Sequence, residues 1–206
     1  MKPKKLVYGL GVNDADYPTQ YIDIRTTNRA ICPYFRTWKS IIQRVAKPSA
    51  IHKDIVYTIH PEWISFMSFK KWMKQQDRVG KVLSRIILDP DNTTFGPDTC
   101  RYISKELHGL ISKKSTPDHL PRGVTIRHTA KGVIRYIAKC SDPRDHTIKY
   151  LGSYDDPIKA HAAYIAFKQS LIRYYITPDL PSDILQGLQL HQERLTMNSL
   201  PTSTVS

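Results

Sequence analysis

The sequence has few cysteines and no long apolar run. Its three cysteines, Cys32, Cys100 and Cys140, are widely spaced and form no Cys-x-x-Cys pair, so neither a zinc ribbon nor a disulfide framework is expected. Free thiols are typical of a reducing cytoplasm, where we expect the protein to act. No stretch of about 18 apolar residues occurs, and the basic start is not followed by an apolar segment. We therefore expect no membrane span and no signal peptide.

Acidic side chains are also scarce. The chain has 18 Asp and Glu residues against 31 Lys and Arg residues, which gives a net charge of +13 and a pI of about 9.7. The excess lies both in residues 1–118 and in residues 119–175, whereas residues 176–206 are slightly acidic. A charge excess of this kind is typical of proteins that bind a polyanion. The alternative is that the positive charge only keeps the protein soluble and binds no polyanion.

The order of motifs predicts an α+β fold in two main parts. Residues 1–111 are expected to form an irregular, mostly helical basic unit, and residues 112–121, with two prolines, are expected to be a linker. Residues 122–175 are predicted to form a three-stranded antiparallel sheet packed on one helix. A tail follows at 176–206, in which Asp183–Leu195 is compatible with a short helix. In the first unit, aromatic residues at helical spacing, such as Phe35, Trp38 and Trp63, are expected to form the core.

The predicted sheet comes from three segments with strand-like alternation. These segments are Val124–Arg127, Val133–Ser141 and Thr147–Gly152. Asp155-Asp156-Pro157 then predicts a helix start. An apolar stripe follows on that helix, made of Ala160, Tyr164, Phe167, Leu171 and Tyr174.

Alternation also predicts which side chains share a face. The helix is expected to cover the face with Val124, Tyr136 and Ala138, so the other face presents mainly basic side chains. A sheet of this size fits the major groove of DNA, where Arg binds guanine and Lys binds phosphate. The alternative is an ordinary solvated strand face. The candidate DNA-binding residues are Arg122, Thr125, Arg127, Lys131, Arg135, Lys139, Lys149 and Tyr150.

Four short motifs of this region occur in a recognisable order. They are Arg122-Gly123-Val124, Arg135-Tyr136-Ile137-Ala138, Tyr150-Leu151-Gly152-Ser153-Tyr154 and the helical Ala160…Ala162-Ala163-Tyr164. This order resembles the ethylene-response-factor type (Apetala-two-like) DNA-binding domain, which implies a three-stranded sheet in the major groove of double-stranded DNA. By position, Arg122, Arg127 and Tyr150 match groove-facing residues of that family. Thr125, Lys139 and Ile148 depart from its plant pattern, so the plant target sequence is not implied.

The first unit carries a second set of motifs. They include Cys32-Pro33-Tyr34-Phe35-Arg36, Glu62-Trp63-Ile64-Ser65-Phe66 and Phe95-Gly96-Pro97-Asp98-Thr99-Cys100. Together they resemble bacteriophage proteins of the HNH-associated type, in which such a unit precedes the sheet domain. The resemblance implies a phage protein that acts in the host cytoplasm.

A catalytic nuclease set is not evident in the sequence. HNH nucleases carry adjacent catalytic and metal-binding residues, whereas none of the eight histidines here adjoins another. Where phage relatives carry a Leu-Asp-Lys-Asp-like segment, this chain has Leu83-Ser84-Arg85-Ile86. We therefore expect a binding protein with no catalytic residues, no metal ligands and no cofactor.

Two alternatives stay open. The first is a nuclease that uses His52, His60 or His108 with Mg²⁺ or another divalent metal at Asp89 or Asp91, although Asp-Pro-Asp-Asn at 89–92 is also strong turn chemistry. The second is a phage protein that binds and inhibits a host protein through outward isoleucines, Ile137 and Ile148, and the segment 183–195.

Overall fold

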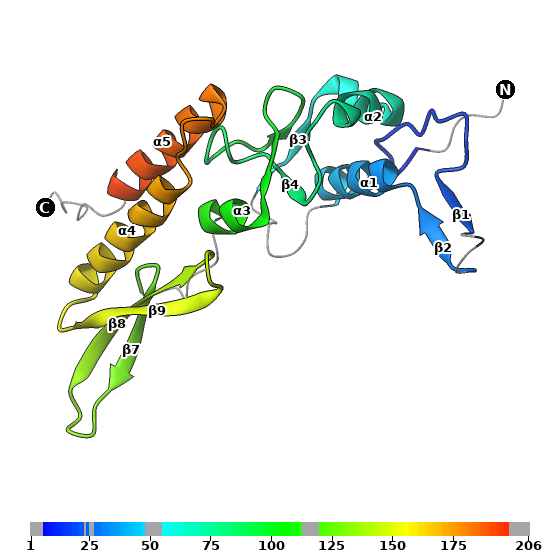
Figure 1. Ribbon diagram of the computed structural model, residues 1–206. Coiled ribbons are helices and arrows are strands. Elements are labelled where there is room, and N and C mark those ends of the chain that lie inside the picture. The colour runs from blue at the N-terminus through cyan, green and yellow to red at the C-terminus, as the bar shows by residue number, and fades with distance from the viewer. Residues whose placement is uncertain (1–5, 23, 25–26, 48–54, 113–119, 198–206) are drawn as a thin grey trace, which may run out of the picture. The chain divides into compact units, whose positions relative to one another are not determined.

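The computed structural model describes residues 6–22, 24, 27–47, 55–112 and 120–197. The fold is α+β, as predicted. It divides into two compact units, shown in Figure 1, and each is described by itself. Unit 1 comprises residues 1–86 and 91–102, and unit 2 comprises residues 87–90 and 103–206. None of the described helices is long and apolar enough to cross a membrane.

Unit 1 combines α-helices with short strand pairs. Its described residues include the helices α1 (Pro33–Ala46) and α2 (Phe66–Lys74) and the 3₁₀ helix η2 (Pro61–Ile64). Its strand pairs are antiparallel β1 (Gln20–Ile22) with β2 (Arg29–Ile31) and parallel β3 (Thr58–Ile59) with β5 (Thr94–Phe95). Strand β4 (Lys81–Ser84) pairs with β6 (Arg101–Ser104), in which the boundary between the units falls.

The aromatic stripes of the sequence form the core of unit 1, as predicted. Phe35, Trp38 and Phe66 are buried and contact one another, and the Trp38 indole N–H donates to the carbonyl of Trp63 over 2.7 Å. The hydrogen bond satisfies a polar group that would be costly to bury unpaired. Because these aromatic rings are buried, they cannot stack on the bases of a nucleic acid.

The described residues of unit 2 form the predicted sheet and three helices. The sheet has the order β7 (Val124–His128), β8 (Ile134–Asp142) and β9 (Thr147–Tyr154), and both pairings are antiparallel. The helices are α3 (Lys105–Ile111), α4 (Pro157–Tyr174) and α5 (Ser182–Met197). The Asp156 carboxylate caps α4 by accepting from the backbone N–H of Ile158 over 2.6 Å.

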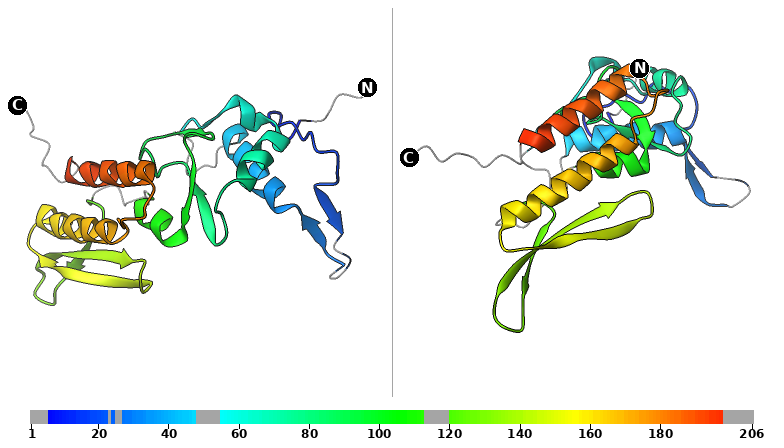
Figure 2. Two further views of the ribbon diagram at one scale, coloured as in Figure 1. Left: turned by 45° about the horizontal axis from the view of Figure 1, so that its top comes forward. Right: turned by 60° about the vertical axis from the view of Figure 1, so that its left-hand side comes forward.

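Three layers make up most of unit 2. Figure 2 shows α4 lying on one face of the sheet and α5 lying on the opposite side of α4. Val124, Ala138 and Ala160 form the centre of the contact between sheet and helix. The buried surface of α4 is wider than the predicted stripe, because Ile165 and Ile172 are buried as well. At its C-terminal end, however, Tyr174 of the predicted stripe is 61% exposed. A helix packed on two sides must bury more than one face.

One predicted boundary differs in the structure. The first unit does not reach residue 111, because α3 belongs to unit 2 together with the sheet. The helix predicted at Asp183–Leu195 is present as α5, which runs from Ser182 to Met197 and buries Ile184 and Leu188. Gly187 of α5 lies so close to the Ile87 carbonyl that a Cβ would meet it at 2.0 Å. Most of the predicted linker, residues 113–119, lies outside the described residues.

Candidate nucleic-acid interface

The face of the sheet that α4 leaves uncovered is basic and free of carboxylates. The strand register places these side chains on that face: Thr125, Arg127, Arg135, Ile137, Lys139, Ser141, Ile148, Tyr150 and Ser153. We call this set the outward face. The four acidic residues of the predicted domain, 122–175, lie elsewhere: at the end of β8, in the β8–β9 turn and just before α4. Arg127, Lys139 and Tyr150 are exposed on the outward face.

The outward face includes five of the eight candidate DNA-binding residues. Arg127 stands opposite Arg135 on the neighbouring strand, and Lys139 stands opposite Tyr150. A register shift at Ala138–Lys139 lets Leu151 pack toward α4 while Tyr150 remains on the outward face. The bulge is therefore what keeps Tyr150 beside Lys139, because a bulge changes which face the following residues occupy.

Arg135 is held in place by the edge strand. Its guanidinium donates to the Ser153 hydroxyl over 3.2 Å and to the Ser153 carbonyl over 2.9 Å. These bonds restrict a side chain that otherwise loses much rotamer freedom on binding. Sequence reasoning selected Arg135 but missed Ser153, whose role depends on the neighbouring strand.

Apolar side chains on the outward face differ in exposure. Ile137 lies at the centre of the middle strand, flanked by Thr125 and Ser153, and is only 5% exposed. Ile148 is 73% exposed and Tyr150 is 62% exposed. Of the two predicted outward isoleucines, Ile137 is thus covered by protein and Ile148 is available to a partner.

Arg122 and Lys131 flank the outward face rather than lying on it. Arg122 precedes β7, where its carbonyl is 2.8 Å from Nδ1 of His161 on α4. The next residue, Gly123, has a φ of +80° and lies against the Tyr164 ring, so a Cβ there would be 2.1 Å from that ring. The Arg-Gly-Val motif therefore requires glycine both for the turn and for close approach. Lys131 is exposed in the β7–β8 turn, which Gly132 closes with a φ of +74°.

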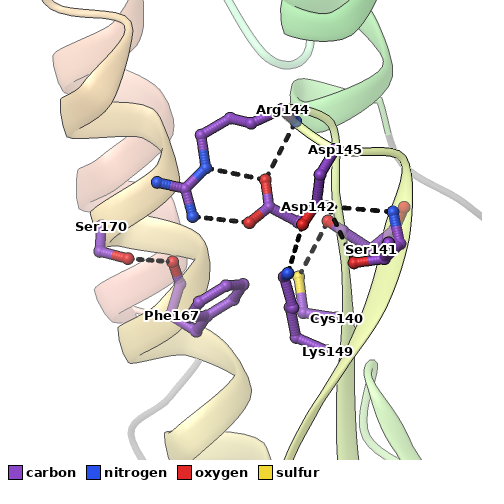
Figure 3. A network of polar contacts seen from close by, with 9 residues as sticks. Cys140, Ser141, Asp142, Arg144, Asp145, Lys149, Phe167 and Ser170 are labelled. Atoms are coloured by element: carbon purple, nitrogen blue, oxygen red, sulfur yellow. Dashed lines mark hydrogen bonds and ion pairs between the residues drawn. The ribbon is translucent and has the colours of Figure 1, made fainter.

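Lys149, predicted as a phosphate contact, does not lie on the outward face. The register places it opposite Cys140, on the face that α4 covers. Its ammonium forms an ion pair with Asp145, as Figure 3 shows. Hydrogen bonds from Lys149 and Thr147 lower the pKa of the Asp145 carboxyl, so this partner stays ionised. Strand alternation separates Lys149 from its neighbour Tyr150.

A second ion pair lies beside the same turn. The Asp142 carboxylate is buried and accepts the Arg144 backbone N–H over 3.0 Å and its guanidinium nitrogens over 2.9 and 2.6 Å. Figure 3 shows the Arg144 guanidinium between this carboxylate and α4, where it lies 5.4 Å from the Tyr174 ring. Asp142, Arg144, Asp145 and Lys149 thus form local pairs, and neither of these carboxylates lies on the outward face.

The residues of the nuclease alternative are not gathered into a metal site in the described parts of the chain. His60 caps η2 in unit 1, and its Nδ1 accepts from the Glu62 N–H. His108 lies on α3 in unit 2. Asp89 and Asp91 flank the turn at Pro90, and His52 lies outside the described residues. Within the described ranges, no three His, Cys, Asp or Glu side chains are placed to hold a metal ion.

Unit 1 carries basic side chains that are held by tyrosines. Lys70 lies 4.2 Å from the Tyr17 ring and donates to its hydroxyl over 2.7 Å, which raises the pKa of Lys70. Arg78 lies 4.7 Å from the Tyr34 ring and donates to its hydroxyl over 3.1 Å. Both cations add to the positive field of the unit.

Comparison with protein-family models, with curated proteins and with solved structures finds no match in any of the three.

Proposed function

We propose that the chain is a double-stranded DNA-binding protein that lays the outward face of β7–β9 in the major groove and carries out no catalysis. The observation that carries this proposal is the composition of the face: three cations, an exposed tyrosine and no carboxylate, on a sheet covered by a helix on its other side. A small sheet supported in this way has the dimensions of a groove reader. The resemblance to the ethylene-response-factor type supports the same reading.

Each residue of the face has a role that its position suggests. Arg127 and Arg135 are adjacent on neighbouring strands and provide bidentate donors for guanine O6 and N7. Lys139 and Lys131 provide phosphate contacts, and Arg122 provides one at the edge of the sheet. Tyr150 and Ile148 offer apolar contact to thymine methyl groups. A phage origin and action in the host cytoplasm remain part of this proposal, on the basis of the resemblance alone.

The test is incubation of the purified full chain with supercoiled plasmid, with and without Mg²⁺, followed by native gel electrophoresis. We expect a retarded plasmid that stays supercoiled under both conditions. Nicked or linear plasmid that forms only with Mg²⁺ would replace the proposal by the nuclease alternative. An unretarded plasmid would remove DNA as the partner and favour a host protein that binds at the exposed Ile148.

A further inference from the structure

The two ends of the outward face carry different side chains. Beside the β7–β8 turn stand two guanidinium groups, Arg127 on β7 and Arg135 opposite it on β8. Toward the β8–β9 turn, strand β9 instead presents Tyr150 and Ile148, which are 62% and 73% exposed. One end of the face therefore offers rows of hydrogen-bond donors, and the other offers aromatic and aliphatic surface.

The guanidinium end is partly ordered by the protein itself. The Nε and Nη2 groups of Arg135 donate to the hydroxyl and the carbonyl of Ser153, over 3.2 and 2.9 Å. Asp155, whose charge also acts on Arg135, is paired with Lys159 over 3.2 Å. A guanidinium has five donors in a fixed plane, so donors of Arg135 remain for a base beside those of the exposed Arg127. Such fixed donors suit the paired acceptors O6 and N7 of guanine.

The centre of the face separates the two ends. Ile137, in the middle strand, is 5% exposed and is flanked by Thr125 and Ser153. A covered aliphatic side chain presents no group to a base edge. Thr125 is exposed, but a hydroxyl that both donates and accepts distinguishes bases poorly. We therefore expect weak discrimination among the base pairs opposite the centre.

Strand geometry sets the distance between the ends. Ile148 stands opposite Ser141, which follows Arg135 on the same strand, β8. At about 3.3 Å per residue, Ser141 lies about 20 Å along β8 from Arg135. A base pair takes about 3.4 Å of the DNA axis, and more along the curved path of the groove. With β8 lying along the groove, the two ends are therefore about four to six base pairs apart.

We propose that the outward face reads a directional target in duplex DNA, with guanine at one end and thymine at the other, about four to six base pairs apart. Arg127 and Arg135 bind O6 and N7 of guanine, and Tyr150 and Ile148 contact the C5-methyl group of thymine. Lys139, opposite Tyr150, holds a phosphate of the DNA backbone. The inference rests on the proposed DNA binding and adds the order, the spacing and the asymmetry of the target.

The first experiment selects targets for the full chain from a randomised duplex library and sequences the retained duplexes. We expect an asymmetric motif with guanine at one end, thymine at the other and little preference between them. A palindromic motif, the same base at both ends, or retention without any motif would overturn the inference and leave DNA binding intact. Failure to retain any duplex would contradict the proposed function, and the inference with it.

Base analogues then show which side chain reads which end of the selected duplex. 7-Deazaguanine removes the N7 acceptor, and uracil removes the methyl group of thymine. The wild-type protein should bind about fivefold or more weakly with 7-deazaguanine, and about three- to fivefold more weakly with uracil, since one buried methyl group is lost.

Two variants at exposed positions separate these responses. Arg127→Ala should lose most of the response to 7-deazaguanine and keep the response to uracil, and Ile148→Ala should show the reverse. Lys131→Ala is the control, because the loss of a phosphate contact weakens binding and leaves both responses unchanged. The inference is wrong if Arg127→Ala and Ile148→Ala both retain both responses, or if each variant loses both alike.

Discussion

The basic residues of unit 2 differ in what their charge meets. Arg144 and Lys149 are each paired with an aspartate, whereas Arg127 and Lys139 lie on a face without carboxylates. In the proposed complex, Arg127 on the outward face of β7 meets base edges, whereas Lys131 in the exposed β7–β8 turn meets the DNA backbone. Similar charges thus have different expected roles because of their positions.

Substitution of these two residues should therefore have different consequences. Arg127→Ala should cost about 1–3 kcal/mol at a preferred sequence and reduce the difference between sequences, since a bidentate contact to a base is lost. Lys131→Ala should weaken binding to all duplexes about equally, since a phosphate contact carries no sequence information. Fluorescence anisotropy over a panel of duplexes measures both. If the two variants lower the affinity for every duplex by the same factor, the assignment of the outward face is wrong.

Asp142 should make stability depend on pH. The hydrogen bond from Arg144 lowers the pKa of this carboxyl in the folded protein, so its ionised form stabilises the fold above the unfolded pKa of about 3.9. That contribution is lost as the pH falls through the lowered folded value. Asp142→Asn should reduce the free energy of unfolding by about 2 kcal/mol at pH 7, since bonds to a charged group are lost.

The measurement is urea unfolding of wild type and Asp142→Asn at pH 7 and at several values from pH 4 downward. The difference between them should shrink toward the acid end. Asp16→Asn, a change at an exposed carboxylate of unit 1, is the control and should show a small effect. A difference that stays constant with pH would contradict the role of the ionised Asp142.

At the scale of elements, two helical glycines of unit 2 meet opposite surroundings. Gly187 brings α5 against the backbone of Ile87, whereas Gly109 on α3 faces open space. The close approach at Gly187 attaches the segment 87–90 to unit 2 although its neighbours in the chain belong to unit 1. A short contact between backbones therefore decides a boundary that composition does not reveal.

Alanine at these two positions should change stability in opposite directions. Gly187→Ala places a Cβ 2.0 Å from the Ile87 carbonyl, so α5 must shift and the protein should lose about 1–3 kcal/mol. Gly109→Ala should gain up to about 1 kcal/mol, because it removes the entropic cost of a helical glycine without a steric penalty. Thermal unfolding of both variants tests the pair. Equal melting temperatures for Gly187→Ala and wild type would mean that α5 does not pack on Ile87.

At the scale of the whole molecule, the net charge of +13 should make DNA binding strongly dependent on salt. Each neutralised phosphate releases counterions and adds about −0.9 to the slope of log K against log salt. The three cations of the outward face and the two at its flanks can make three to five phosphate contacts, which predicts a slope between about −2.7 and −4.5. Titrations of one duplex at several salt concentrations provide the slope. A steeper value would show that cations of unit 1 also contact DNA, and a slope near zero would contradict a phosphate-based interface.

Much of unit 2 could be predicted from the sequence alone. Alternation in residues 124–152 predicted three strands, and Asp156-Pro157 predicted the start of α4, because side-chain period and capping are local properties. The same alternation placed Arg127, Arg135, Lys139 and Tyr150 on one face, where the structure has them. The aromatic core of unit 1 followed from helical spacing for the same reason.

Other features depended on contacts between segments far apart in the chain. The sequence by itself determined the charge, the elements and most of the outward face. Only the tertiary structure decided that Lys149 pairs with Asp145, that Ser153 holds Arg135 and that α5 packs on α4. It also decided that Lys168 of α4 is buried, because burial depends on the segments that pack around a helix. A local pattern fixes the direction of a side chain, and the distant segment that meets it fixes its environment.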